Sequence, residues 1–186
     1  MGLVSRCGWT VLAMLLATAA TTAMAANVRS PDGQTVVTVD VDRNGAPRYA
    51  VARNGTAVMP AGFLGMRFQS QPAFDDGFRV AGTSTSTHDA TWEQPWGERR
   101  YVRDRHNELL VTFDSAQGAA RTFNLRVRVF DDGFGFRYEV PQQPGYDAVN
   151  ITDELTEFRL DPDATQEITA WWIPGRRWNR YEYPYL

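Results

Sequence analysis

The chain has 186 residues, of which 43% are hydrophobic, 12% aromatic and 22% charged. This composition excludes an intrinsically disordered protein and a collagen-like repeat. The length excludes a complete (β/α)8 barrel, which needs about 250 residues. The formal net charge of −3 gives no general attraction to nucleic acid or to an anionic membrane. The sequence contains no lysine, which excludes Schiff-base chemistry and a phosphate-binding lysine.

The first residues have the pattern of a secretory signal peptide. A single positive charge, Arg6, precedes an apolar run over residues 9–17, and a small-x-small cleavage site follows at Ala23-Met24-Ala25. The alternative is a retained membrane anchor, but the apolar run is shorter than the ~20 residues that a spanning helix needs. We therefore predict a signal peptide over residues 1–25. The remaining domain, residues 26–186, is then exported to the periplasm or secreted, with no membrane contact after cleavage.

From residue 26 onward the sequence alternates between strand patterns and turns. In residues 122–129 and 134–140, apolar and polar residues alternate on either side of Asp131-Asp132-Gly133, which predicts an antiparallel hairpin. Alternation at 109–113 indicates the strand before it. Further turns are predicted at 31–33, 43–45, 53–55, 75–77 and 144–145. Because no stretch keeps a 3.6-residue apolar period, we predict an all-β protein of two packed antiparallel sheets, with residues 84–97 as one long ordered connection.

Several kinds of active site find little support in the sequence. The two histidines, His88 and His106, do not have the spacing of a zinc motif, and we interpret them as surface or hydrogen-bonded structural residues. No serine lies in a Gly-x-Ser-x-Gly context. The only cysteine, Cys7, leaves with the signal peptide, which excludes thiol catalysis and cysteine-ligated zinc in the mature chain.

The segment Trp92-Glu93-Gln94-Pro95-Trp96-Gly97-Glu98 allows two interpretations. The flat faces of sugar rings pack on aromatic side chains, and a pair of carboxylates about 5 to 9 Å apart can hydrolyse a glycosidic bond. On this hypothesis Glu93 and Glu98 form such a pair beside Trp92 and Trp96. In the structural interpretation, which we favour, the tryptophans close one end of the sandwich and the glutamates pair with Arg99 or Arg100.

The C-terminal segment combines tryptophan, tyrosine and arginine residues, a composition typical of ligand platforms and interface anchors. It contains Trp171-Trp172-Ile173-Pro174 and the run Tyr181-Glu182-Tyr183. Basic and aromatic residues also alternate in nucleic-acid grooves. Export and the acidic balance of the chain argue against that function. We expect these aromatic residues to be buried against a neighbouring structure.

Six sequence blocks, taken together and in this order, resemble the amino-terminal domain of glycoside hydrolase family 97. These enzymes are exported bacterial α-glucosidases and α-galactosidases. The resemblance covers residues 28–185, and no block is specific by itself. The blocks are Ser30-Pro31-Asp32-Gly33, the run from Thr91 to Glu98, Asn107-Glu108-Leu109, the run from Asp131 to Tyr138, the run from Ile151 to Phe158, and Trp171-Trp172-Ile173-Pro174.

The resemblance implies an amino-terminal β-super-sandwich similar to galactose mutarotase, followed in the family by a catalytic (β/α)8 barrel and a small β domain. The catalytic carboxylates belong to the barrel, so this chain is expected to be inactive alone. It would pack on the barrel and help to line the pocket for an α-glucoside or α-galactoside oligosaccharide. Because the family's sandwich is longer than residues 26–186, we expect this one to be incomplete.

The resemblance also implies a calcium ion in the sugar pocket, with one glutamate from the amino-terminal domain as a ligand. By its position that residue is Glu182, although a salt bridge to Arg177 or Arg180 is an equal alternative. Calcium takes six to eight oxygen ligands, so the site requires the barrel as well. The candidate sugar-binding residues are Trp92, Trp96, Trp171 and Trp172. A stand-alone secreted carbohydrate-binding module is the alternative function.

Overall fold

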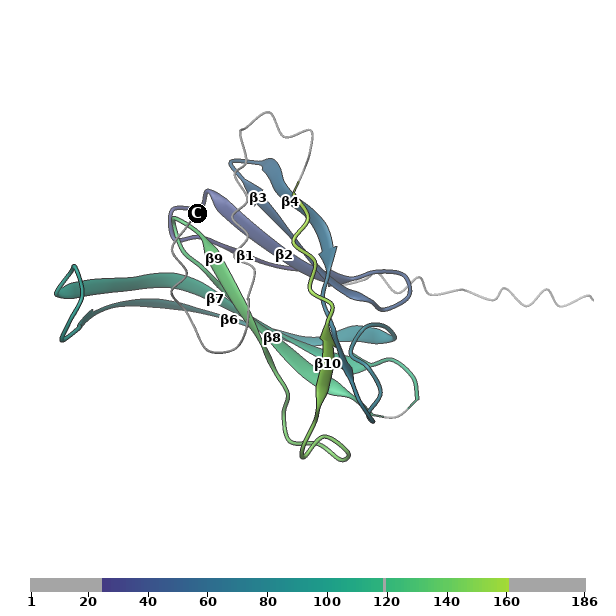
Figure 1. Ribbon diagram of the computed structural model, residues 1–186. Helices are drawn as coiled ribbons and strands as arrows, with labels where there is room; N and C mark the ends of the chain where they lie inside the picture. Colours follow the sequence, from purple (N-terminus) through teal and green to yellow (C-terminus); the bar gives the residue numbers. More distant parts are fainter. Residues whose placement is uncertain (1–24, 119, 161–186) are drawn as a thin grey trace, which may run out of the picture.

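The computed structural model describes residues 25–118 and 120–160, which form ten strands and no helix. Accordingly, no helix within these ranges is long and apolar enough to cross a membrane. The strands lie in two four-stranded antiparallel sheets and a two-stranded ladder, and the two larger sheets face each other (Figure 1). This confirms the predicted antiparallel sandwich. Residues 1–24 of the predicted signal peptide, Trp171, Trp172 and Glu182 lie outside the described residues.

The first sheet consists of successive hairpins in the order β1-β2-β3-β4. Its strands are Ala26–Arg29 (β1), Thr35–Val41 (β2), Pro47–Arg53 (β3) and Thr56–Phe63 (β4). β2 buries every second residue, because successive side chains of a strand point to opposite faces. The turn between β3 and β4 has positive φ at Asn54 (51°) and Gly55 (80°), as tight hairpin turns require. The Asn-Gly sequence therefore makes the predicted turn.

The second sheet has the order β6-β7-β8-β9. Its strands are Phe78–Glu93 (β6), Tyr101–Ser115 (β7), Thr122–Val129 (β8) and Phe134–Glu139 (β9). The predicted hairpin on either side of Asp131-Asp132-Gly133 is confirmed as β8–β9, and the predicted preceding strand is part of β7.

The prediction that residues 84–97 form one long ordered connection is wrong for residues 84–93, which belong to β6. β6 continues to Glu93, which pairs with Tyr101 of β7. This strand cannot be recognised from the sequence because the side chains of residues 81–93 are exposed on both faces of the sheet. Neither face therefore requires apolar residues, and the two-residue alternation that identifies a half-buried strand is missing.

β6 and β7 extend well beyond the rest of the second sheet. β8 pairs with β7 only between Asn107 and Asp114, so residues 88–106 continue as a two-stranded ribbon. This ribbon, which we call the arm, projects to the left of the sandwich in Figure 1. An isolated two-stranded ribbon is marginally stable in water, so the arm depends on contacts at its base.

A short ladder connects the two large sheets. Met66–Phe68 (β5) pairs with Ile151–Glu154 (β10), and the chain then runs along the end of β4. There the amide of Glu157 donates a hydrogen bond of 2.9 Å to the carbonyl of Phe63. A Cβ atom at Gly62 would lie 2.7 Å from the carbonyl oxygen of Glu157, so this close approach requires glycine.

Aromatic side chains fill the space between the sheets. Phe123 stacks on Phe74 and Phe113, with ring centroids 5.2 and 4.8 Å apart, and Phe78 meets it edge-on at 5.1 Å. All four rings are almost completely buried. Tyr49 of the first sheet is also buried, with its ring 5.2 Å from that of Phe136 in β9. Such contacts combine a large buried apolar area with favourable ring geometry.

The outer face of the second sheet carries an ion-pair network. Arg126 donates hydrogen bonds of 2.6 and 3.1 Å to Glu139 and another to Glu108. Glu108 also accepts a 2.8 Å bond from Arg128, and Glu139 accepts one of 2.8 Å from Arg137. The hydrogen bond from Arg126 is the main reason that the pKa of Glu139 falls to about 2. Burial opposes ionisation of Glu108, but its hydrogen bonds from Arg128 and Arg126 outweigh burial and lower its pKa.

We predict that Glu139→Gln makes the free energy of unfolding less dependent on acid pH. A carboxylate whose pKa is lowered in the folded state stabilises the fold above its unfolded pKa, here about 4.5, and this contribution is lost as the pH falls toward 2. The variant should lose about 1 to 2 kcal/mol at pH 7, because solvent screens a partly exposed network. Urea unfolding at pH 7, 5 and 3 measures this. The deficit should shrink between pH 5 and pH 3, and an equal deficit at every pH would contradict the prediction. Glu98→Gln at the exposed arm tip is the matched control.

Candidate functional site

The arm ends in three exposed aromatic side chains. Trp92 is 50% exposed, Trp96 82% and Tyr101 59%. The guanidinium of Arg100 lies over the ring of Tyr101, 5.4 Å from its centroid. Exposed aromatic side chains held beyond a folded core are typical of a binding surface.

Backbone and ion-pair contacts hold the tip of the arm together. The amide of Gln94 donates a 3.0 Å hydrogen bond to the carbonyl of Arg100, and Gly97 has a φ of 117°, which favours glycine. The guanidinium of Arg100 also pairs with the carboxylate of Glu93 at 2.8 Å. The expected pairing of Glu93 with Arg100 is therefore confirmed. The expectation that the tryptophans close the end of the sandwich is wrong, since Trp92 and Trp96 stand in solvent at the arm tip.

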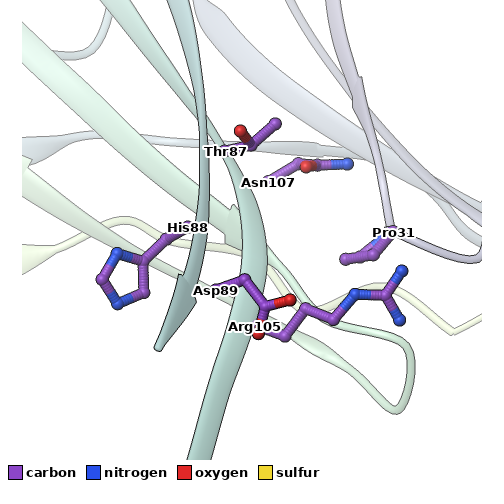
Figure 2. A pocket seen from close by; sticks show the side chains of 6 residues that line it. All are labelled: Pro31, Thr87, His88, Asp89, Arg105 and Asn107. Carbon is purple, nitrogen blue, oxygen red and sulfur yellow. The ribbon is translucent and has the colours of Figure 1, made fainter. Parts of the chain in front are cut away.

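A pocket of about 290 Å³ lies where the arm leaves the sandwich, lined by Pro31, Thr87, His88, Asp89, Arg105 and Asn107. Figure 2 shows Thr87, Asp89, Arg105 and Asn107 on the side of the ribbon that faces Pro31, with the His88 ring on the other side. The carboxylate of Asp89 accepts hydrogen bonds of 2.7 and 2.6 Å from Arg103, and these hold its pKa below the ordinary value. The pocket therefore offers charged groups that are already engaged in ion pairs.

One residue, Asp131 in the β8–β9 turn, ties the base of the arm to both sheets. Its carboxylate accepts a hydrogen bond of 3.2 Å from Arg105 on β7 and one of 2.8 Å from the amide of Asp32 in the β1–β2 turn. Its carbonyl oxygen accepts a bond of 3.1 Å from Arg53 on β3. Nearby, the side chain of Asn107 donates a 2.8 Å bond to the carbonyl of Arg29.

The two histidines form a pair on the opposite face of the arm. They are cross-strand partners, their ring centroids lie 5.1 Å apart, and Nδ1 of His106 lies 2.6 Å from the carboxylate of Asp104. Phe130 packs on the other side of His106, at 5.0 Å, and His106 is buried. The structural interpretation is thus confirmed for His106. The pairing itself was not predicted, although it follows from the register once β6 is recognised as a strand.

No group of three or more histidine, cysteine, aspartate or glutamate side chains that could hold a metal ion occurs in residues 25–118 and 120–160. The candidate calcium ligand Glu182 lies outside these ranges, as do Trp171 and Trp172. Of the predicted sugar-binding residues, the described part of the chain contains Trp92 and Trp96, and it places both at the tip of the arm.

Comparison with known proteins places this geometry in context. The sequence profile of a family described as Glycosyl-hydrolase 97 N-terminal matches residues 28–186. A glycoside hydrolase family 97 enzyme from Pseudoalteromonas sp. strain K8, solved in complex with panose, is 42% identical, with a TM-score of 0.75 over 85% of this chain and 23% of that one. The structure of a beta-arabinopyranosidase gives 28% identity and a TM-score of 0.66 over 73% of this chain and 21% of its own.

A curated relative from Streptomyces bingchenggensis (strain BCW-1), named "Probable retaining alpha-galactosidase", is 31% identical over 127 residues. That alignment covers 68% of this chain and 19% of the relative. The chain thus spans about a fifth of the length of the proteins that it matches.

We predict that Asp131→Ala weakens the base of the arm. The substitution removes the acceptor shared by Arg105 and the amide of Asp32, and it should lower the free energy of unfolding by about 1 kcal/mol, because both groups are partly solvated. Urea unfolding measures the change. Asp132→Ala, at an exposed position of the same turn, is the control and should change stability by less than about 0.5 kcal/mol. Equal effects of the two substitutions would show that the shared acceptor contributes nothing.

Proposed function

The chain belongs to the Glycosyl-hydrolase 97 N-terminal family, and on that premise we propose that it is the non-catalytic, carbohydrate-associated domain of an exported glycoside hydrolase. In this proposal the sandwich packs against the catalytic (β/α)8 barrel of the longer enzyme and helps to line its sugar pocket. The substrate is an α-glucoside or α-galactoside oligosaccharide. The signal peptide over residues 1–25 directs the protein to the periplasm or the medium.

The arm is the observation that carries this proposal. It holds Trp92 and Trp96 beyond the sandwich, where their rings are available to the C–H faces of a sugar. The arm has its own base, fixed by Asp131, so the aromatic tip has a defined position relative to both sheets. A domain that contributes to a pocket in a neighbouring domain needs side chains that project beyond its own core, as these do.

The chemistry of the arm supports binding and not hydrolysis. Glu93 is held in an ion pair with Arg100, whereas a catalytic acid must be able to deliver a proton to the glycosidic oxygen. The chain also spans only about a fifth of the matched enzymes. We therefore propose that it is inactive by itself and that the catalytic carboxylates belong to the barrel.

Glu182 is the candidate calcium ligand of this domain. A calcium ion takes six to eight oxygen ligands, and the described ranges contain no cluster that could supply them. On the family resemblance, Glu182 would provide one ligand of a site that the barrel completes.

A stand-alone carbohydrate-binding module is the second candidate, and the 82% exposure of Trp96 favours it. A module would bind maltose or a galactoside by itself through Trp92 and Trp96. The scaffold domain instead needs the barrel to complete the sugar pocket.

We predict that Trp96→Ala in the full-length enzyme lowers kcat/KM for an oligosaccharide by about fivefold, mainly through KM, because one aromatic–sugar contact is worth about 1 kcal/mol. Arg137→Ala, on the outer face of the second sheet, is the control and should leave both constants unchanged.

Isothermal titration calorimetry of the mature chain with maltose and with a galactoside separates the two candidates. Saturable binding that Trp96→Ala abolishes would establish the module and overturn the scaffold proposal. Unchanged kinetics in the full-length variant would exclude Trp96 from the sugar pocket.

A further inference from the structure

The pocket at the base of the arm is separate from the aromatic tip. Pro31 of the β1–β2 turn lies on one side of it, and side chains of β6 and β7 lie on the other (Figure 2). Thr87 in this pocket and Trp92 at the tip are both in β6, about 16 Å apart at 3.3 Å per residue. The volume of about 290 Å³ is near the lower limit of small-molecule sites, about 300 Å³. The pocket therefore has room for one small ligand that does not reach the tip.

The register of the arm gathers four polar side chains on the face that looks toward Pro31. Thr87 pairs with Asn107, and Asp89 pairs with Arg105. Successive side chains of a strand point to opposite faces, so these four share one face, and Figure 2 shows the His88 ring on the other. Two adjacent cross-strand pairs thus present a compact group of hydroxyl, amide, carboxylate and guanidinium.

This polar group keeps hydrogen-bonding capacity that the described residues do not use. The Thr87 hydroxyl has no partner among them, and neither has Oδ1 of Asn107, whose amide nitrogen donates to a backbone carbonyl. Arg105 uses one of its five N–H donors. Each carboxylate oxygen of Asp89 accepts one hydrogen bond from Arg103 and keeps a second lone pair. Donors and acceptors therefore remain available side by side.

The balance of charge in the pocket indicates the class of ligand. The carboxylate of Asp89 is paired with Arg103, and the guanidinium of Arg105 is paired with Asp131. These four groups have no net charge, so an anion would meet the Asp89 carboxylate and a cation would meet the Arg105 guanidinium. A neutral ligand with several hydroxyl groups suits both, because every hydroxyl can donate and accept a hydrogen bond.

We propose that the base of the arm is a carbohydrate-binding site that holds one neutral pyranose ring. The hydroxyls of the sugar donate hydrogen bonds to Asp89 and to Oδ1 of Asn107, and they accept hydrogen bonds from Arg105. The Thr87 hydroxyl serves in either role, and Pro31 provides an apolar side. A ring holds its hydroxyls in fixed directions, so binding it orders fewer bonds than binding an open-chain polyol. The site goes beyond the function proposed above, because it needs neither the tip of the arm nor the barrel.

Heteronuclear NMR of the mature chain, titrated separately with methyl α-glucopyranoside and methyl α-galactopyranoside, tests the proposal. At least one glycoside should shift the amide signals of residues 87–89 and 105–107 along a saturable curve. The Kd should be about 1 to 10 mM, as expected for a ligand of this size. If neither glycoside gives saturable shifts at these amides up to about 100 mM, the proposal is wrong.

Two further ligands test whether a neutral ring is what the pocket recognises. Sorbitol has hydroxyl groups but no ring and should bind at least about fivefold more weakly than the better glycoside. Sodium phosphate should give no saturable shift at the same amides. Equal affinity for sorbitol would show that the ring is not recognised. Saturation by phosphate would reveal an anion site, and either result would overturn the proposal.

Substitutions then locate the binding. Thr87→Val keeps the shape of the side chain but removes its hydroxyl, and it should weaken glycoside binding by about fivefold. The matched control is Thr91→Val, on the same face of β6 but outside the pocket, which should leave the Kd unchanged. Equal losses in the two variants would overturn the assignment to this pocket. The titration of the unsubstituted chain does not depend on either variant.

Trp96→Ala distinguishes this site from the sugar contact proposed for the tip. The variant should leave the glycoside Kd at residues 87–89 and 105–107 unchanged, whatever its effect on the full-length enzyme. Loss of these shifts in Trp96→Ala would mean that the sugar binds through the tip, and the proposal for the base of the arm would then be wrong.

Discussion

The packing of the two sheets across β7 determines the rest of this structure. Leu109, Val111 and Phe113 of that strand point into the space between the sheets and are almost fully buried. From Tyr101 to His106, β7 pairs with β6 alone among the described strands. β7 thus contributes its C-terminal half to the core and its N-terminal half to the arm. The contact between the sheets fixes the direction of the arm, and the arm carries the exposed tryptophans.

The polar contacts at the edge of this packing position the arm without extending the core. Asp131 gathers hydrogen bonds from β7, from the β1–β2 turn and, through its carbonyl, from β3. Each is modest because the groups are partly solvated, yet together they join both sheets at the point where the arm begins. The sandwich supports the base of the arm, and the function proposed above assigns sugar recognition to the side chains at the tip. This separation agrees with a domain that assists a catalytic neighbour.

The strands that bury one face were predictable, whereas the arm was not. β8 and β9 alternate apolar and polar residues around an Asp-Asp-Gly turn, so their pairing follows from the side-chain period of a strand. The Thr- and Ser-rich stretch before Trp92 lacks this alternation because both of its faces meet solvent. Because the sequence did not predict this strand, it did not predict the His88–His106 pair either, since that pair depends on the register between β6 and β7. Trp92 and Trp96 were identified as candidates from composition, but only the structure places them in solvent.

Amide hydrogen exchange along β7 in the isolated mature chain tests this account most directly. If the sheet-to-sheet contact alone stabilises the strand, the amides of residues 109–113 should exchange only through global unfolding. Those of residues 101–106 should exchange at least about a hundredfold faster through local opening, because a two-stranded ribbon is marginally stable. Equal protection along the whole strand would contradict the account, since the arm would then be part of the cooperative core.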